Sequence, residues 1–187
     1  MLVFVLIGLN LLLFIIGLLW ILVPALYGLP SRPTKPDRIR KALKLVGLKQ
    51  DETLYDLGAG DGRVLLIAAK EFDAKAVGIE IGPIQCALIW LRMTAGGLSD
   101  KIKIQWGNFF KTNLSEADVV YVYATSTEVA KLAPYLEKQM KPGSRVVSIS
   151  ADFAEWEPST FDDHDLIFVY EMPPKPGSLI SYLLRNS

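Results

Sequence analysis

A short apolar segment, 53–57, runs directly into a turn that is rich in glycine and in acidic side chains. The residues of this turn that could contact a ligand are Asp56, Gly58, Ala59, Gly60, Asp61 and Gly62. Glycines at the carboxyl end of a strand leave the backbone bare, so a ligand can approach it closely. The amides of a helix that starts there can donate hydrogen bonds outward. The pattern therefore predicts a ligand-binding turn between a strand and a helix.

The acidic side chains narrow the choice of ligand. A dinucleotide-binding turn has the spacing Gly-x-Gly-x-x-Gly, whereas here Gly62 comes one residue earlier. Carboxylates at Asp56 and Asp61 would repel a pyrophosphate held at the helix N-terminus. They favour a ligand that has no phosphate and carries positive charge. S-adenosylmethionine has a sulfonium, an ammonium and a ribose, and we expect it as the cofactor.

Two further segment ends place polar groups at the same edge. Glu80 ends the next apolar segment, where a carboxylate can accept hydrogen bonds from both ribose hydroxyls. Asn108 and Phe109 follow the third such segment, and Asn108 could bond the adenine amino group while an apolar neighbour covers the ring. Each polar residue also has a structural interpretation: a turn cap for Asp56, an edge carboxylate for Glu80 and an Asx-turn for Asn108. Their occurrence at successive strand ends favours a cofactor site.

The elements that must position these residues alternate between strands and helices. Helices are predicted over 37–46, 63–72, 84–94 and 127–140, and strands over 53–57, 76–80, 102–106, 119–123, 145–149, 165–170 and 179–184. Such alternation predicts an α/β fold, namely a Rossmann-like seven-stranded, mostly parallel sheet with helices on both faces. The last two strands have no long helix between them, and we expect them to form a terminal antiparallel hairpin at the sheet edge.

The N-terminal segment has a different composition. From Leu2 to Val23 the only polar side chain is that of Asn10, and this length suffices for one transmembrane helix. The alternative, a cleaved signal peptide, would require a basic start and a small-residue cleavage site. We therefore divide the chain into a transmembrane anchor (1–24), a proline-rich linker (25–36) and an α/β domain that carries the predicted S-adenosylmethionine site (37–187). Basic residues follow the apolar segment, which places the domain on the cytoplasmic side.

Other site types find little support in the composition. The chain has 20 basic and 20 acidic residues and no strongly basic segment, so nucleic acid is not an expected partner. Its one cysteine, Cys86, and one histidine, His164, form no cluster with metal-ligand spacing, so no metal site is expected either. The partners that remain are the lipid bilayer and a substrate.

The residues from about Asp37 to Pro174 resemble the class I S-adenosylmethionine-dependent methyltransferases. More narrowly, the chain resembles the membrane-anchored lysine methyltransferases that act on the c-subunit of ATP synthase and on the adenine nucleotide translocase. The resemblance rests on the apolar N-terminus, on the motifs 55–63 and 77–80 with Pro83, and on Trp156-x-Pro158. It implies S-adenosylmethionine as cofactor and a lysine of a small apolar membrane protein as acceptor. Eukaryotic relatives imply the mitochondrial inner membrane, but the absence of a presequence before the apolar segment favours a prokaryotic plasma membrane.

Methyl transfer requires aligned reactants more than an acid or a base, so no residue is assigned a catalytic role. Tyr123, Thr125 and Trp156 are candidates to line an acceptor channel, although Tyr123 could be a core strand residue and Trp156 a packing residue. Two alternatives stay open. The acceptor could be a lipid headgroup or a lipophilic small molecule, or the domain could be a membrane-tethered binding module without chemistry.

Overall fold

The computed structural model describes residues 1–26 and 33–186. Residues 27–32, half of the predicted linker (25–36), lie outside these ranges. The helices are α1 (Leu2–Leu26), α2 (Pro36–Leu45), α3 (Arg63–Glu71), α4 (Pro83–Ala95), α5 (Ser126–Gln139) and α6 (Leu179–Asn186), with a short 3-10 helix η1 (Phe109–Lys111). The strands are β1 (Thr53–Leu57), β2 (Lys75–Glu80), β3 (Ile102–Trp106), β4 (Val119–Val122), β5 (Arg145–Ile149), β6 (Trp156–Glu157), β7 (Thr160–Asp162), β8 (Ile167–Glu171) and β9 (Lys175–Pro176).

Seven strands form one sheet in the order β3-β2-β1-β4-β5-β8-β7. The first five strands are parallel, whereas β8 pairs antiparallel with both β5 and β7. The predicted Rossmann-like, mostly parallel sheet is therefore confirmed. The strand order reverses between β1 and β4, and ligands of open α/β sheets bind outside the carboxyl ends of the strands at such a point.

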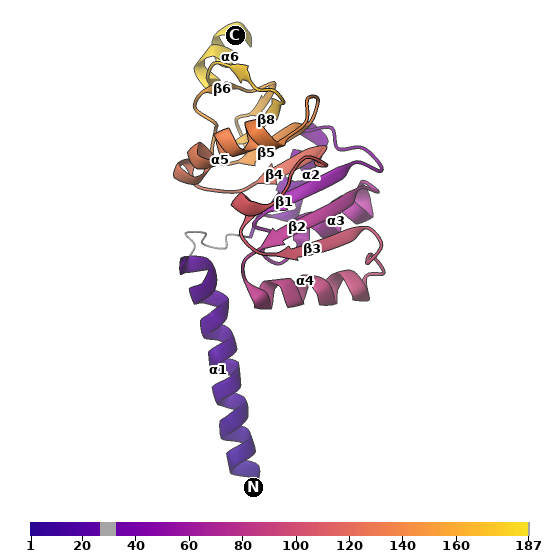
Figure 1. Ribbon diagram of the computed structural model, residues 1–187, viewed down its shortest axis with the longest axis vertical. Coiled ribbons are helices and arrows are strands. Elements are labelled where there is room, and N and C mark those ends of the chain that lie inside the picture. Colours follow the sequence, from indigo (N-terminus) through magenta and orange to yellow (C-terminus); the bar gives the residue numbers. More distant parts are fainter. Residues whose placement is uncertain (27–32, 187) are drawn as a thin grey trace.

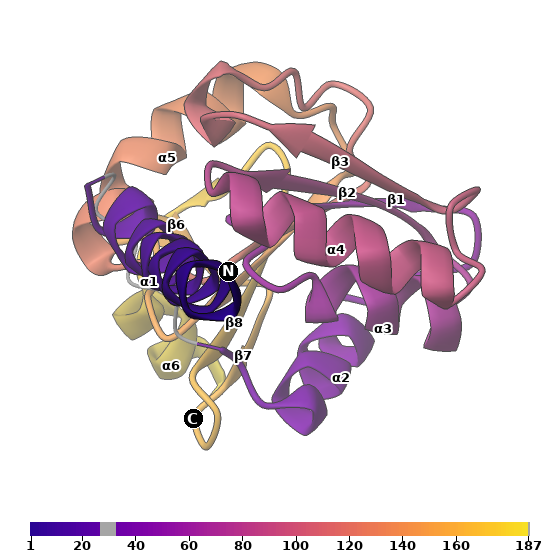
Figure 2. The ribbon, with the colours of Figure 1, turned by 90° about the horizontal axis from the view of Figure 1, so that it is seen from below.

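Helices cover both faces of this sheet (Figure 1). Helices α2, α3 and α4 lie side by side on one face (Figure 2), where Leu54 of β1 packs with residues such as Leu65 and Ile89. Helix α5 covers the other face, where Tyr55 of β1 joins the second core cluster. Successive β1 side chains thus enter opposite layers, as the pleat requires. The central strand β4 is buried along its whole length, which agrees with its unbroken apolar sequence.

The predicted terminal hairpin is wrong in its second strand. Residues 179–184 form helix α6, and the antiparallel edge consists of β7 and β8. The short strands β6 and β9 form a separate two-stranded sheet. Ser178 explains the helix, because its hydroxyl oxygen accepts a hydrogen bond from the amide of Ser181 at 3.3 Å and its carbonyl accepts one from the amide of Tyr182 at 3.1 Å. A serine cap before an apolar segment begins a helix, whatever the strand-like composition that follows.

Helix α1 extends away from the sheet (Figure 1), and its side chains from Leu2 to Leu19 are exposed. Within the described ranges it is the one helix that is long and apolar enough to cross a membrane. Its carboxyl end lies against α4. The carboxyl end of α1 therefore lies on the side of the domain that α4 covers.

Candidate active site

Two adjoining cavities open at the carboxyl edge of the sheet. Their volumes are about 310 and 610 Å³, within the range of small-molecule sites. The residues that line both are Gly58, Glu80, Ile81, Thr125 and Glu128. Because these walls are shared, one elongated ligand could extend from the smaller cavity into the larger.

The glycine turn and Glu80 are joined by backbone hydrogen bonds. Gly60 adopts a φ of +55°, and its amide donates to one carboxylate oxygen of Glu80 at 2.7 Å. The amide of Gly82 donates to the other oxygen at 2.8 Å. The amide of Gly58 donates to the carbonyl of Ile79 at 3.0 Å, which continues the pairing of β1 with β2 into the turn. Glu80 therefore holds the turn and the start of α4 in one arrangement.

Gly62 differs from the other residues of the turn because it lines neither cavity. It precedes α3 with a φ of +77°, and a Cβ built there would lie 2.8 Å from Ile89 of α4. A side chain at this position would therefore clash with α4, besides being strained in the left-handed region. The structure gives Gly62 a role in packing α4 against the turn.

Asp56 and Glu80 are buried carboxyl groups, with exposed fractions of 4% and 6%. None of the ion pairs found in the described parts of the chain includes either residue. Burial raises the pKa of Asp56 to about 8, and the neighbouring Glu80 and Asp61 add to the shift. Burial also raises the pKa of Glu80, against the opposing effect of its bonds from Gly82 and Gly60. A cation that entered the larger cavity would relieve this cost.

Asp61 also lines the larger cavity but, unlike Asp56 and Glu80, it has cationic partners. Burial alone would raise its pKa, yet hydrogen bonds from Arg63 and Arg92 outweigh that effect and hold the pKa at about 2. The guanidinium nitrogens lie 2.8 and 2.9 Å from its carboxylate. The expected repulsion of a phosphate by Asp61 is therefore not supported, because two arginines neutralise the charge. The other carboxyl groups that line this cavity are those of Asp56, Glu80 and Glu128.

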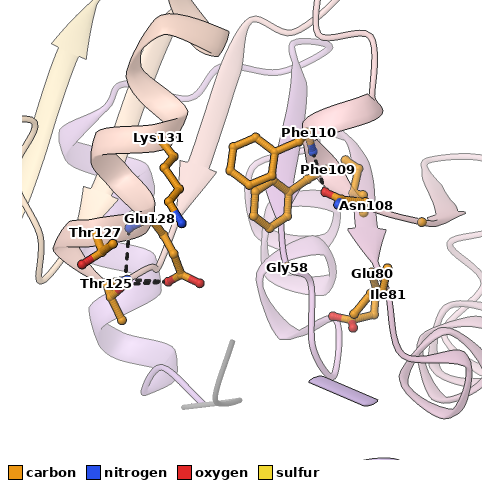
Figure 3. Close-up of a pocket in the computed structure, with 12 residues that line it drawn as sticks. Gly58, Glu80, Ile81, Asn108, Phe109, Phe110, Thr125, Thr127, Glu128 and Lys131 are labelled. Atoms are coloured by element: carbon orange, nitrogen blue, oxygen red, sulfur yellow. Dashed lines mark hydrogen bonds between the residues drawn. The ribbon is translucent and has the colours of Figure 1, made fainter. Parts of the chain in front are cut away.

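The smaller cavity has an aromatic wall (Figure 3). Phe109 and Phe110 lie with ring centroids 4.6 Å apart, and Ile81 lines the same cavity. The side-chain oxygen of Asn108 accepts a hydrogen bond from the amide of Phe110 at 2.9 Å and so caps η1. The Asx-type interpretation of Asn108 thus describes this contact, while the residue still lines the cavity.

Several walls of the larger cavity were not expected from the sequence. They are Pro33, Thr34, Gln85, Tyr121, Glu128, Ser150 and Ala151. The carbonyl of Thr34 accepts a hydrogen bond from Arg63 at 2.9 Å, so the residues just before α2 are tied to the glycine turn. Tyr121 faces this cavity from β4, and burial raises the pKa of its hydroxyl. Thr34 was not expected in the cavity because it falls in the predicted linker. Tyr121 was not expected there because it falls in a uniformly apolar predicted strand.

Two of the three acceptor-channel candidates line the larger cavity. The guanidinium of Arg38 lies 5.9 Å from the ring centroid of Tyr123. Thr125 caps α5, and its hydroxyl donates to Glu128 at 2.8 Å (Figure 3). Trp156 lines neither cavity: it stacks on Phe153 with centroids 4.2 Å apart and donates to Glu137 at 2.8 Å. Its placement in an acceptor channel is corrected to a core role.

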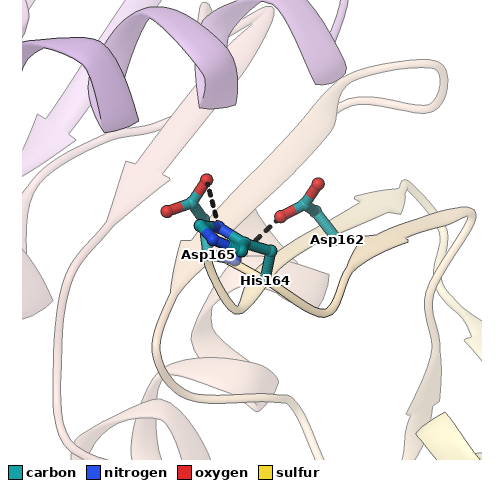
Figure 4. A group of neighbouring side chains, drawn as sticks. All are labelled: Asp162, His164 and Asp165. Carbon is teal, nitrogen blue, oxygen red and sulfur yellow. Dashed lines mark hydrogen bonds and ion pairs between the residues drawn. The ribbon is translucent and has the colours of Figure 1, made fainter.

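A second acidic group lies in the β7–β8 hairpin (Figure 4). Potential ligand atoms of Asp162, His164 and Asp165 lie within 4.8 Å of one another. The ammonium of Lys41 lies 2.7 Å from both carboxylates, while the side chain of His164 is 85% exposed. Lys41 thus supplies the positive charge that these acids require. The cluster joins α2 to the hairpin.

Comparison with solved structures identifies the class of protein. An RNA methyltransferase from Salinibacter ruber, solved with S-adenosyl-L-homocysteine, superposes with a TM-score of 0.75 and 32% identity over 78% of this chain and 97% of that chain. Together with the sheet order and the glycine turn, this places the protein among the S-adenosylmethionine-dependent methyltransferases.

The family follows from the sequence comparisons. Residues 56–160 match the family described as the ANTKMT methyltransferase domain, and the chain belongs to that family. A protein-lysine N-methyltransferase of Saccharolobus islandicus is 38% identical over 69% of this chain and 81% of its own length. The lysine N-methyltransferase for the ATP synthase c-subunit of Mus musculus is 26% identical over 80% of this chain and 60% of its own length. The predicted cofactor and enzyme class are thereby confirmed.

Proposed function

We propose that this enzyme transfers a methyl group from S-adenosylmethionine to a lysine side chain of a membrane or membrane-associated protein. The observation that carries the proposal is the pair of buried carboxyl groups, Asp56 and Glu80, which face the cavities without a cationic partner among the described residues. Family membership supports the reaction, and the names of the relatives support lysine as the acceptor.

In the proposed arrangement the cofactor extends through both cavities. Its adenine occupies the smaller cavity, between Ile81 and Phe109 and beside Asn108. Glu80 accepts hydrogen bonds from the ribose hydroxyls in addition to those from the backbone. The amino-acid end lies in the larger cavity along the turn from Gly58 to Asp61, where Asp56 balances its ammonium group. The acceptor then enters past Tyr123 and Thr125.

The reaction is an in-line displacement at the methyl carbon. The lone pair of a neutral lysine amine forms the new carbon–nitrogen bond, the sulfur–carbon bond breaks, and the sulfur keeps its electron pair as S-adenosylhomocysteine. Alignment of the reactants can supply roughly 7–11 kcal/mol of the barrier. The aromatic and small apolar walls at Tyr121, Tyr123, Ala124 and Ala151 lower the pKa of an entering lysine by desolvation. The ammonium proton passes to solvent water before transfer, so no residue is required to act as a base.

The anchor completes the proposal. Helix α1 would span the bilayer once, with the domain on the cytoplasmic side of a prokaryotic plasma membrane, because basic residues follow the apolar segment. A mitochondrial inner membrane would be the corresponding location in a eukaryotic cell. Since Pro33 and Thr34 line the larger cavity, the functional unit begins before residue 37.

One structural relative is named as an RNA methyltransferase, so RNA must be tested as the acceptor. Basic side chains that contact phosphates usually dominate RNA affinity. Here Arg63 of the larger cavity pairs with Asp61, and among the residues that the structure describes the other basic one lining the cavities is Lys131. This charge balance favours a cationic acceptor over a polyanion.

The test uses cells that lack the gene as the source of acceptors. Full-length enzyme and tritiated S-adenosylmethionine are incubated with membranes, extracted lipid and total RNA from those cells. We expect label in membrane protein, with methylated lysine found by mass spectrometry, and none with the Glu80→Ala variant. Label confined to lipid or RNA would overturn the lysine proposal. Absence of cofactor binding in a calorimetric titration would favour a binding module without chemistry.

A further inference from the structure

Helix α4 is packed on one side only. Of its thirteen residues, Gln85 and Ile89 are buried. The opposite side presents Ala87, Trp90, Leu91 and Thr94, all exposed, with exposed fractions of 58% for Trp90 and 59% for Leu91. The single charged residue of the helix, Arg92, binds Asp61 of the glycine turn at 2.9 Å. The outward side is therefore apolar and carries no free charge.

A second exposed tryptophan lies on the neighbouring edge strand. Trp106 ends β3 with an exposed fraction of 72%, and its indole nitrogen donates to the carbonyl of Ile81 at 2.9 Å. Its polar atom is thus satisfied while its ring stays outside the core. We call Ala87, Trp90, Leu91, Thr94 and Trp106 together the α4 face.

The position of the α4 face relative to α1 indicates what covers it. The carboxyl end of α1 contacts α4, and α4 lies across the direction of α1 at the lower side of the domain (Figure 1). Seen from below, along α1, helix α4 is in front of the sheet (Figure 2). A bilayer that α1 crosses would therefore meet α4 lying along its surface.

We propose that the α4 face rests in the headgroup region of the bilayer that α1 spans. The inference rests on the anchor in the proposed function. Tryptophan is favoured at the membrane interface, because its ring is apolar while its N–H remains hydrogen-bonded. An uncharged helix side that lies flat on the surface buries its apolar groups there. Helix α4 begins directly after Glu80 and Ile81, so this contact brings the cofactor cavities to the bilayer surface.

The experiment measures the depth of single probes in the full-length chain. A Cys86→Ala background receives either Leu91→Cys or, as a matched control, Ile180→Cys. Ile180 is an equally apolar, 69% exposed residue of α6, at the other end of the domain from α1. Both variants carry an environment-sensitive fluorophore and are reconstituted into phosphatidylcholine–phosphatidylglycerol vesicles that contain a nitroxide near the headgroups.

We expect the probe at position 91 to be quenched several-fold more strongly than the probe at position 180. Equal quenching at both positions, or none at either while the chain floats with the vesicles, would overturn the proposed contact and leave the anchor intact. A position-91 probe that is shielded from water but not quenched by the lipid would instead indicate a protein partner. If the chain does not float with vesicles, the anchor of the proposed function fails, and the contact fails with it. None of these readouts depends on methyl transfer.

Discussion

The chain contains two groups of acidic side chains whose environments shift their pKa values in opposite directions. At the carboxyl edge of the sheet, burial raises the pKa values of Asp56 and Glu80. In the β7–β8 hairpin, hydrogen bonds from Lys41 lower the pKa values of Asp162 and Asp165. The first pair is buried without a cation among the described residues, whereas the second pair is partly exposed and already paired with Lys41.

The difference separates a binding site from a structural contact. An ion pair that is complete within the chain leaves no electrostatic reason for a ligand to bind. Buried carboxylates that lack a cationic partner destabilise the fold, and this cost is relieved when a cationic ligand binds. Asp61 lies between these cases, since it lines the larger cavity but is satisfied by Arg63 and Arg92.

The largest effect is expected for Glu80→Ala. The variant loses the predicted ribose contacts together with the bonds from Gly60 and Gly82, and charged hydrogen bonds contribute enough to predict an affinity loss of about 100-fold. Isothermal titration with S-adenosylmethionine measures it. Asp162→Asn is the matched control in the hairpin and should bind like the wild type. Equal losses in both variants would break the distinction between the two acidic groups.

Asp56→Asn should weaken cofactor binding by about tenfold, through loss of one charge partner of the ammonium. In the wild type the affinity should rise as the pH increases from about 6 toward 8, because the ionised carboxylate binds the cofactor's ammonium group while that group still holds its proton. This rise should be absent from the variant. Titrations at several pH values give both results, and a pH profile that is the same in the two proteins would contradict the role of Asp56.

The same variant should be more stable without cofactor. A carboxyl group whose pKa is raised on folding stabilises the fold below its unfolded pKa, and this contribution is lost as the pH rises toward about 8. Asparagine has no such loss. Thermal unfolding should therefore give a higher Tm for Asp56→Asn near pH 8, with the difference vanishing near pH 4. A lower Tm at pH 8 would mean that a cationic group already pairs with Asp56.

Asp61→Asn should have the opposite pattern to Asp56→Asn, with a small loss of cofactor affinity and a loss of fold stability. Cofactor affinity should fall by only about threefold, because the carboxylate is occupied by Arg63 and Arg92. The fold should lose about 1 kcal/mol of stability at neutral pH, since the contacts are partly exposed to solvent. Its pKa is lowered to about 2, so the wild-type advantage should disappear as the pH falls toward 2. Chemical denaturation measures this, and an affinity loss as large as that of Glu80→Ala would place Asp61 with the first group.

Much of the fold follows from local sequence patterns. The strands at 53–57, 102–106 and 145–149 lie where they were predicted, because each is a short apolar segment bounded by turn residues. The strand predicted over 179–184 was wrong, because a short apolar segment fits the period of a helix as well as that of a strand. The cap at Ser178 decides in favour of a helix. The strands β6, β7 and β9 have only two or three residues each, too few to show a period.

The cavity walls follow less completely, because several depend on contacts between distant segments. The glycine turn, Glu80 and Phe109 could be found, since each follows a predicted strand. The pairing of Asp61 with Arg92 could not, because Arg92 reaches it from helix α4, 31 positions along the chain. Thr34 reaches the cavity through a hydrogen bond to Arg63, 29 positions away. Trp156 was misplaced because its burial depends on distant segments, among them Glu137 of α5, which accepts its indole hydrogen bond from 19 positions away.

The smallest effect on cofactor binding is expected for Lys41→Met, which tests the acidic group in the β7–β8 hairpin. The variant removes the ammonium that pairs with both Asp162 and Asp165 while keeping a side chain of similar length. A carboxyl group with a lowered pKa stabilises the fold above its unfolded pKa, and this contribution is lost in acid. The variant should thus have a slightly lower Tm at neutral pH and nearly the wild-type Tm near pH 2. Cofactor affinity should stay within about twofold of the wild type. If affinity fell as it does in Glu80→Ala, the hairpin acids would be coupled to the cavity, and pairing within the chain would no longer distinguish structural acids from binding ones.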